Sequence, residues 1–260
     1  MLRILTTGNW SAEALRATLV PSTRRIVPEV EAAIDDAWRE GKARLGEKLF
    51  DGPMCRMERF AASRHALELT LSLTTYRIFL GTNLNWRGAP KGFGPDIAAN
   101  SVGISSALLT ADGYLLFGRR NDRVAYYPNR VHPFAGSLEQ RDLPDISSAV
   151  RREMHEELSL GEADLTSIRC LGIIEDIAIR QPEMIFSSRS TLTRARIESQ
   201  LDDTEHGGML AIEARHETIE KVLLDAKEFT PVAVGTLLLF GKDQFGEVWY
   251  DRAKQSATNL

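Results

Sequence analysis

The chain has 260 residues, which is enough for one large domain or two small ones with an ample hydrophobic core. A hydrophobic content of 43% and a charged content of 26% are typical of an ordinary soluble globular protein. The net charge is -4 and no block of basic residues is present, which argues against nucleic acid as the main partner.

The first part of the chain is predicted to mix helices and strands. Apolar residues at helical spacing, with a proline in the first turn, predict a helix over residues 28–46. The patterns at 54–62 and 67–73 predict two strands. Residues 74–80 are predicted to form a short helix that ends at Gly81.

The second part of the chain follows a predicted boundary. Residues 86–96 are dense in Gly and Pro, which favours a loop between two subdomains. From Val102 onward two apolar runs are separated by Ala111-Asp112-Gly113, a strong signal for a hairpin turn. A helix is predicted at about 145–159. The remaining predicted elements are strands at 167–179, 184–193 and 208–214 and helices at 216–226 and 231–240.

Three glutamates lie on one side of the helix predicted at 145–159. Glu153, Glu156 and Glu157 are spaced i, i+3 and i+4, so they are neighbours that repel one another. They border the apolar face of the helix, whereas a purely solvated acidic stripe belongs opposite that face. A divalent metal such as Mg²⁺, which binds carboxylate oxygens together with phosphates, would explain the cluster. A solvated helix face paired with Arg152 is the open alternative.

The residues from Arg152 to Leu160 resemble the helical half of the Nudix hydrolase signature. That half reads Arg-Glu-aliphatic-any-Glu-Glu-any-Gly-aliphatic, and Ser159 replaces its glycine here. The upstream half fits less well, because Gly136 lies two residues too far from the arginine. The lone glutamate of the signature falls on Pro144, and Asp145 or Asp142 is its candidate substitute.

Three further motifs resemble one branch of this family, the animal UDP-glucose/UDP-galactose pyrophosphatase-like proteins with an atypical Nudix box. The motifs are residues 49–53, 75–83 and 102–104, and the likeness extends over about 28–240. The resemblance implies an α/β fold, a Nudix-like α/β/α sandwich with a mixed sheet. The sandwich is expected to cover residues 98–260. Residues 1–97 are then an N-terminal α+β subdomain that shapes the nucleotide pocket.

The resemblance also implies an activity, the Mg²⁺-dependent (or Mn²⁺-dependent) hydrolysis of a nucleotide sugar. UDP-glucose, giving UMP and glucose 1-phosphate, is the favoured substrate. Glu153, Glu156 and Glu157 would hold the metal, and Arg152 would complete the catalytic group. Two alternatives stay open: another substrate with the same linkage, such as ADP-ribose, or a nucleotide-sugar-binding protein without turnover.

Three residues outside the helix are candidates for completing the metal site. Gly136 could turn its backbone toward the metal, or it could be an ordinary turn glycine. Glu183 and Glu205 are candidates for an additional ligand or a general base, and the alternative for each is a plain surface glutamate.

The same resemblance implies a uridine-binding face. Phe50 or Tyr76 could stack on a base, Arg77 could pair with a phosphate, and Asn83 could satisfy polar edges. Otherwise these are core and cap residues of a short helix. His132 stands where an acidic residue is expected, which leaves the sugar or base selectivity open. Two basic residues at the end of a predicted strand, Arg119 and Arg120, could approach phosphates or be solvated edge charges.

The rest of the sequence points to a reducing compartment. Cys55 and Cys170 lie far apart without metal-ligand spacing, which favours two buried free thiols over a disulfide. The N-terminus lacks the pattern of a signal peptide, and no apolar run approaches the ~18 residues of a membrane span. We therefore expect a cytoplasmic protein without a membrane partner, and the sequence leaves open whether it is a monomer or a homodimer.

Overall fold

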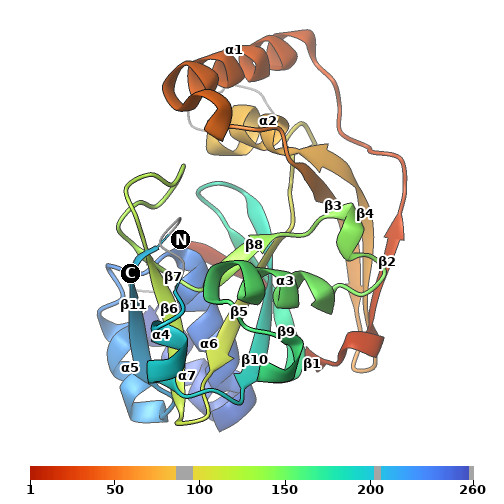
Figure 1. Cartoon of the computed structure of the whole chain (residues 1–260). Helices are drawn as coiled ribbons and strands as arrows, with labels where there is room; N and C mark the ends of the chain where they lie inside the picture. The colour runs from red at the N-terminus through yellow and green to blue at the C-terminus, as the bar shows by residue number, and fades with distance from the viewer. Residues whose placement is uncertain (86–95, 202–205, 258–260) are drawn as a thin grey trace.

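The computed structural model describes residues 1–85, 96–201 and 206–257. A large sheet carries helices on both faces, and a second unit lies above it (Figure 1). The strands of the large sheet are β1 (Leu2–Trp10), β5 (Gly103–Leu109), β6 (Tyr114–Arg120), β7 (Val131–His132), β8 (Phe134–Ser137), β9 (Leu165–Asp176), β10 (Gln181–Ser190) and β11 (His206–Glu213).

The large sheet is mixed, as the fold prediction required. Its main path is β1-β9-β10-β5-β6-β11, with β7 paired to β6 and β8 paired to β5. Strands β10 and β5 are parallel, whereas β9 and β10, and β5 and β6, are antiparallel. The start of β5 lies between the start of β10 and the short strand β8, and the candidate site is found there.

Helices cover both faces of the large sheet. They are α3 (Ser147–Leu158), α4 (Arg194–Glu198), α5 (His216–Leu224), α6 (Pro231–Phe245) and α7 (Glu247–Ala257). Alternate residues of a strand point to opposite faces. In β5, Ile104 belongs to the core that contains the apolar side of α3, and Ala107 belongs to the core that contains α5, α6 and α7. The sheet is therefore the middle layer of an α/β/α sandwich.

Residues 15–84 form the second unit, called here the upper unit after its place in Figure 1. It contains the sheet β2-β4-β3, built from β2 (Leu15–Leu19), β3 (Pro53–Ala62) and β4 (Leu67–Thr75). Its helices are α1 (Pro28–Leu45) and α2 (Tyr76–Phe79), and α2 continues as a π-helix over Leu80–Leu84. Single 3₁₀ turns lie at Ala12–Ala14, Gly46–Lys48, Gln140–Asp142 and Glu162–Asp164.

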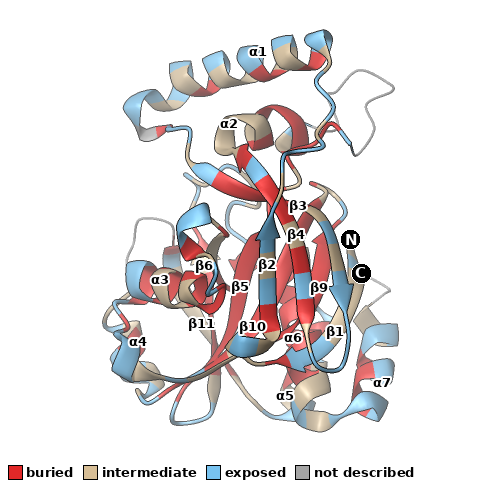
Figure 2. Ribbon diagram, turned by 90° about the vertical axis from the view of Figure 1, so that its right-hand side faces the viewer, coloured by how far each residue is buried: buried red, intermediate tan, exposed pale blue. Residues whose placement is uncertain are grey.

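The upper unit and the large sheet share a core. Leu69 and Leu71 of β4 are buried in the same cluster as Met154 of α3. Red buried positions continue from the small sheet into the large one in Figure 2. The Trp10 indole N–H, at the end of β1, donates to the carbonyl of Ser63 in the β3–β4 turn at 2.8 Å. Burial and this hydrogen bond fix the small sheet of the upper unit against the face of the large sheet that α3 also covers.

Most predicted elements are confirmed to within a few residues, but the prediction that the short helix ends at Gly81 was wrong. Thr74 and Thr75 complete β4, and the helix passes through Gly81 as far as Leu84. A methyl group at Gly81 would lie 2.6 Å from the Cα of Ile34 in α1. The glycine thus permits close packing of two helices and does not mark a helix end.

The predicted division at residue 97 stays a prediction, with one qualification. Strand β1 pairs with β9, so the first ten residues belong to the large sheet. The predicted loop at 86–96 lies outside the described residues except for its last position. Strands β1, β2, β7 and β8 and helices α4 and α7 were not predicted. None of the helices that the structure describes is long and apolar enough to cross a membrane.

Candidate active site

Two of the predicted glutamates lie buried where α3 meets the sheet. Glu153 and Glu157 keep only 7% and 8% of their surface exposed. Gly136 of β8 faces Glu153 so closely that a methyl group at this position would overlap the carboxylate. Glycine is therefore required there, and the backbone of β8 can approach any group that Glu153 binds.

The third glutamate is more exposed than this pair. The side chain of Glu156 is 52% exposed, and its Oε2 lies 3.6 Å from Nη1 of Arg152. Among the described residues, no group of three His, Cys, Asp or Glu side chains is gathered tightly enough to hold a metal ion. The helix therefore brings together two of the three predicted ligands, and any further protein ligands come from other elements.

Arg152 fixes the position of Glu153. Its guanidinium pairs with the Glu153 carboxylate, and its Nη2 donates to the carbonyl of Ser137 at 2.9 Å and to Asp142 at 3.1 Å. Of the two aspartates that were candidates for the signature's glutamate, Asp142 is thus the one that binds Arg152. The other candidate, Asp145, pairs instead with Arg151 at 3.3 Å, on the outer side of the helix.

Glu183 approaches the same point from β10. Its parallel partner on β5 is Gly103, where an added methyl group would overlap the Glu183 carboxylate. Only 4% of Glu183 is exposed, and its carboxyl accepts a hydrogen bond from the Ser105 hydroxyl. Burial raises the pKa of Glu183 to about 8, and the charges of Asp176 and, less strongly, Glu153 contribute to the increase.

The pKa of Glu153 is raised as well, to about 7. Burial is the main cause, and it outweighs the lowering effect of Arg152, while Glu157 and Glu156 raise the pKa further. His206 adds a ring nitrogen 3.5 Å from Glu157. A divalent cation would favour the charged form of these carboxylates, and oxygen ligands are what Mg²⁺ prefers. The donor set and the bare backbone at Gly136 therefore fit such a cation.

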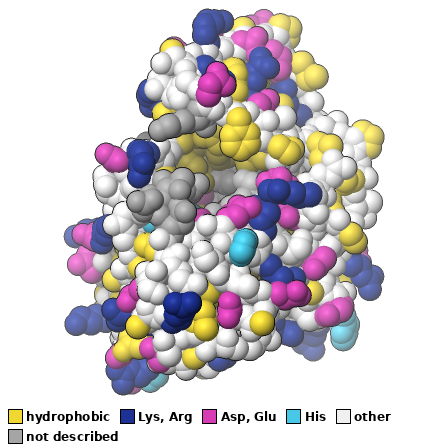
Figure 3. All heavy atoms as spheres, viewed as in Figure 1, with side chains coloured by type: hydrophobic (Ala, Val, Ile, Leu, Met, Phe, Trp, Pro, Cys, Tyr) yellow, Lys and Arg dark blue, Asp and Glu magenta, His cyan; other side chains and the backbone are white. Residues whose placement is uncertain are grey.

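A hollow of about 220 Å³ opens beside Glu183, between the upper unit and the large sheet. Figure 3 shows the surface hollowed there, with hydrophobic side chains along the upper rim. Its lining combines one carboxyl group, one guanidinium and two tyrosine rings. The lining residues are Tyr76, Arg120, Val124, Ala125, Tyr126, His132, Ala135, Gly136, Ser137, Gln181 and Glu183.

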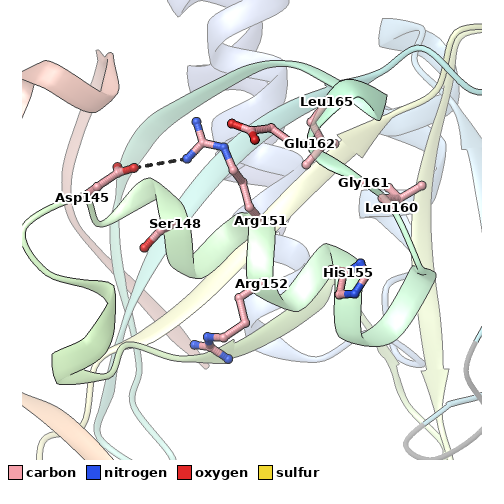
Figure 4. A pocket seen from close by; sticks show the side chains of 9 residues that line it. All are labelled: Asp145, Ser148, Arg151, Arg152, His155, Leu160, Gly161, Glu162 and Leu165. Atoms are coloured by element: carbon pink, nitrogen blue, oxygen red, sulfur yellow. Dashed lines mark hydrogen bonds and ion pairs between the residues drawn. The ribbon is translucent and has the colours of Figure 1, made fainter.

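A larger hollow, of about 540 Å³, lies on the outer side of α3. Figure 4 shows its lining, in which Arg151 reaches toward Asp145. Glu183 and Gly136, the glycine that faces Glu153, line the smaller hollow and not this one, so we assign the site to the smaller hollow.

The aromatic side chains at the small hollow join the two units. The guanidinium of Arg120 lies over the ring of Tyr126, 4.8 Å from its centre. Tyr126 in turn meets Phe79 of α2 edge-on, with ring centres 6.3 Å apart. Phe79 is also 6.2 Å from Tyr76, which lines the hollow. Both units therefore contribute to the wall.

His132 lines the hollow in an uncharged form. Its Nδ1 is hydrogen-bonded to the hydroxyl of Thr230 at 2.8 Å. Burial lowers the pKa of His132 well below its usual value, and the nearby charge of Arg120 adds to the decrease. This position therefore offers a neutral hydrogen-bonding group where an acidic residue was expected.

Of the residues predicted to bind uridine, some line the hollow and others do not. Tyr76 lines the hollow, whereas Phe50 is 72% exposed and does not line it. Arg77 pairs with Asp35 of α1, away from the lining. Asn83 is fully buried, and its amide donates to the carbonyl of Ile179 at 2.9 Å. Asn83 therefore ties the π-helix to the β9–β10 turn.

Tyr126, Gln181 and Arg120 are among the lining residues that sequence reasoning missed or left undecided, and Glu205 lies outside the described residues. Tyr126 and Gln181 stand in a loop and at a strand start, where no periodic pattern singles them out. Arg120 was noted only as one of two adjacent arginines. Its place as the last residue of β6, beside the hollow, could have been found only by pairing the strands correctly.

Comparison with known proteins identifies relatives over most of the chain. The mouse (Mus musculus) protein named uridine diphosphate glucose pyrophosphatase NUDT22 is 28% identical over 279 residues, covering 93% of this chain and 90% of the relative. The bovine (Bos taurus) protein of the same name is 30% identical over 197 residues, covering 64% and 68%. A NUDIX family hydrolase from Clostridium perfringens is a distant structural likeness, with a TM-score of 0.35, 12% identity, and 56% and 98% coverage. No family model matches the chain.

Proposed function

The chain is a member of the Nudix hydrolases, in the same branch as the NUDT22 pyrophosphatases, and on this ground we propose that it hydrolyses the pyrophosphate of a nucleotide sugar. UDP-glucose is the proposed substrate, after the activity named for the relatives. In this reaction water forms a bond to one phosphorus and the bridging P–O bond breaks. UMP and glucose 1-phosphate are the products, and the attacking water loses its proton.

One observation supports this chemistry above the others. The buried carboxyl groups of Glu153 and Glu183 have pKa values raised to about 7 and about 8. Each faces a glycine, Gly136 and Gly103 respectively, and Gly136 and Glu183 line the small hollow. Buried acids with raised pKa values are typical of sites that bind a cation or transfer a proton.

We assign Glu153, Glu157 and the backbone of Gly136 to holding Mg²⁺, with Mn²⁺ as its substitute. When bound, the metal would supply charge neutralisation and alignment of the phosphates. Glu156 was predicted as a third ligand, and its exposed side chain suits an outer position beside Arg152 better. The role of Arg152 is to hold the Glu153 carboxylate in place.

Glu183 is the proposed acceptor of the proton that water loses. Its side chain lines the hollow, and a pKa near neutrality matches the working range of a general base. Glu183 would hold this proton at its carboxylate oxygen, next to the hydroxyl of Ser105, and release it to solvent as the products leave.

The direct test is product analysis with UDP-glucose and Mg²⁺, beside ADP-ribose and ADP-glucose. We expect UMP and glucose 1-phosphate, and we expect Glu157→Gln to lower the rate by about a hundredfold or more because metal binding supplies several kcal/mol of charge stabilisation. Glu162→Gln is the matched control, since Glu162 is exposed and lies outside the site.

The possible outcomes separate the alternatives. An unchanged rate for Glu157→Gln would refute the site. Turnover of an adenine substrate alone would keep the chemistry and reject the uridine assignment. Binding of nucleotide sugars without any product would support the non-catalytic alternative.

A further inference from the structure

Arg120 is a buried cation that lacks a counter-ion within the part of the chain that the structure describes. It is 7% exposed, and its Nε is buried without a hydrogen-bond partner. Its guanidinium makes no ion pair or side-chain hydrogen bond with any described residue, and its recorded neighbour is the ring face of Tyr126. A charge removed from water in this way is strongly unfavourable unless something pairs with it.

The surroundings of Arg120 stabilise the charge only in part. The ring of Tyr126 offers a cation–π contact at 4.8 Å. Glu183 lies near enough for Arg120 to lower its pKa, but the two form no ion pair. His132 is kept neutral, in part by Arg120. The guanidinium therefore faces the hollow with its hydrogen-bonding capacity unused.

The neighbouring arginine shows that this arrangement is particular to position 120. Arg119 is 44% exposed in its side chain and pairs with Glu228 at 2.8 Å. It also donates to the carbonyl of Asn129 at 3.1 Å. Adjacent residues of a strand point to opposite faces, so β6 sends one arginine to solvent and the other to the hollow.

We propose that Arg120 binds the pyrophosphate of the nucleotide substrate, an inference that rests on the proposed function. The pyrophosphate is the anionic part of a nucleotide sugar, so it is the part that can supply the missing counter-charge. The planar guanidinium offers paired N–H donors that match two phosphate oxygens. Tyr126 holds the guanidinium plane, and the neutral groups of His132 and Gln181 are left for the uncharged parts of the substrate.

The test compares Arg120→Gln, Arg120→Lys and the matched control Arg119→Gln. The first measurement is calorimetric binding of inorganic pyrophosphate in the presence of Mg²⁺. We expect Arg120→Gln to bind at least about tenfold more weakly than the wild type, which corresponds to 1.4 kcal/mol or more. Arg119→Gln should bind as the wild type does.

A second measurement separates the phosphate from the base. Arg120→Gln should weaken UMP binding by a similar factor and leave uridine binding unchanged. With the true substrate, the loss should appear in both KM and kcat, because the phosphate charge is present in the ground state and is redistributed in the transition state. Equal affinity of Arg120→Gln and wild type for pyrophosphate would overturn the proposal.

Arg120→Lys keeps the inference testable if the glutamine variant does not fold. Lysine retains the charge but lacks the paired N–H donors of the planar guanidinium. We therefore expect an unchanged melting temperature and severalfold weaker pyrophosphate binding. A merely structural arginine predicts the reverse, a lower melting temperature with unchanged affinity for pyrophosphate. If the wild type binds pyrophosphate through Arg120 but does not hydrolyse UDP-glucose, the proposed function fails and this inference stands.

Discussion

At the scale of single residues, Asp142 and Asp145 show how one loop separates two similar acids. Both lie near the position where the family signature has its glutamate. Asp142 is 4% exposed and binds the guanidinium of Arg152, which pairs with Glu153. Asp145 is exposed and binds Arg151. Asp142 therefore supports the proposed metal ligand through one intervening residue.

We expect Asp142→Asn to lower the apparent affinity for Mg²⁺ by about 10- to 100-fold, the usual effect of losing a group that orients a ligand. Asp145→Asn is the matched control and should remain within about twofold of the wild type. The measurement is the rate of UDP-glucose hydrolysis as a function of Mg²⁺ concentration. Equal effects of the two substitutions would contradict the assignment.

Glu183 links the site to the pH dependence of stability in the metal-free protein. Its pKa is about 8 in the folded chain and near 4.5 when unperturbed. Between these values the folded state keeps a proton that the unfolded state has lost. The free energy of unfolding must therefore fall as the pH rises through this window.

Glu183→Gln should flatten this decline. In the presence of a chelator we expect the variant to be more stable than the wild type at pH 8.5, by on the order of one to three kcal/mol, and similar to it below pH 5. Urea unfolding at several pH values measures the difference. Glu153 titrates nearby and supplies part of the slope that remains. Parallel curves for variant and wild type would refute the prediction.

At the scale of elements, α3 ends at Ser159, the residue that replaces the glycine of the family signature. The φ of Ser159 is 54° and its ψ is 27°, which lies in the left-handed region that favours glycine. Its backbone N–H still donates to the carbonyl of His155 at 2.9 Å. The end of the signature helix therefore keeps the backbone geometry of a glycine cap while carrying a side chain.

Ser159→Gly should stabilise the protein by about 0.5–1 kcal/mol, because removing the Cβ relieves the left-handed strain and only part of the gain is lost to unfolded-state entropy. Ser199→Gly, at the end of α4 where φ is −72°, should give no gain. Urea unfolding of both variants provides the measurement, and hydrolysis should be unaffected. A gain for Ser199→Gly equal to that for Ser159→Gly would contradict this explanation.

At the scale of the whole molecule, periodic patterns predicted most of the fold. The strand hairpin after Val102, the signature helix and the later strands and helices follow from hydrophobic spacing. Strand β1 was missed because its exposed and half-buried residues show no clear alternation. The contribution of the upper unit to the hollow depends on packing between distant segments, such as Phe79 against Tyr126, which spacing along the chain does not reveal.

The site was predictable to the extent that it lies on one element. Glu153 and Glu157 on α3 could be read from their spacing, and their burial agrees with the core-bordering position. Arg77 and Asn83 could not be placed, because their partners lie on α1 and in the β9–β10 turn. Arg120 required knowledge of which strand face meets the hollow.

The pairing of β1 with β9 also determines when the large sheet can be completed during synthesis. Leu2 is the partner of Asp176, so the first strand leaves the ribosome long before its partner strand β9 has been synthesised. Contacts between such distant segments slow folding. Until then β1 lacks its neighbour, and unpaired strand edges are prone to aggregation. The nascent chain is therefore most exposed to misassembly before residue 176 is translated.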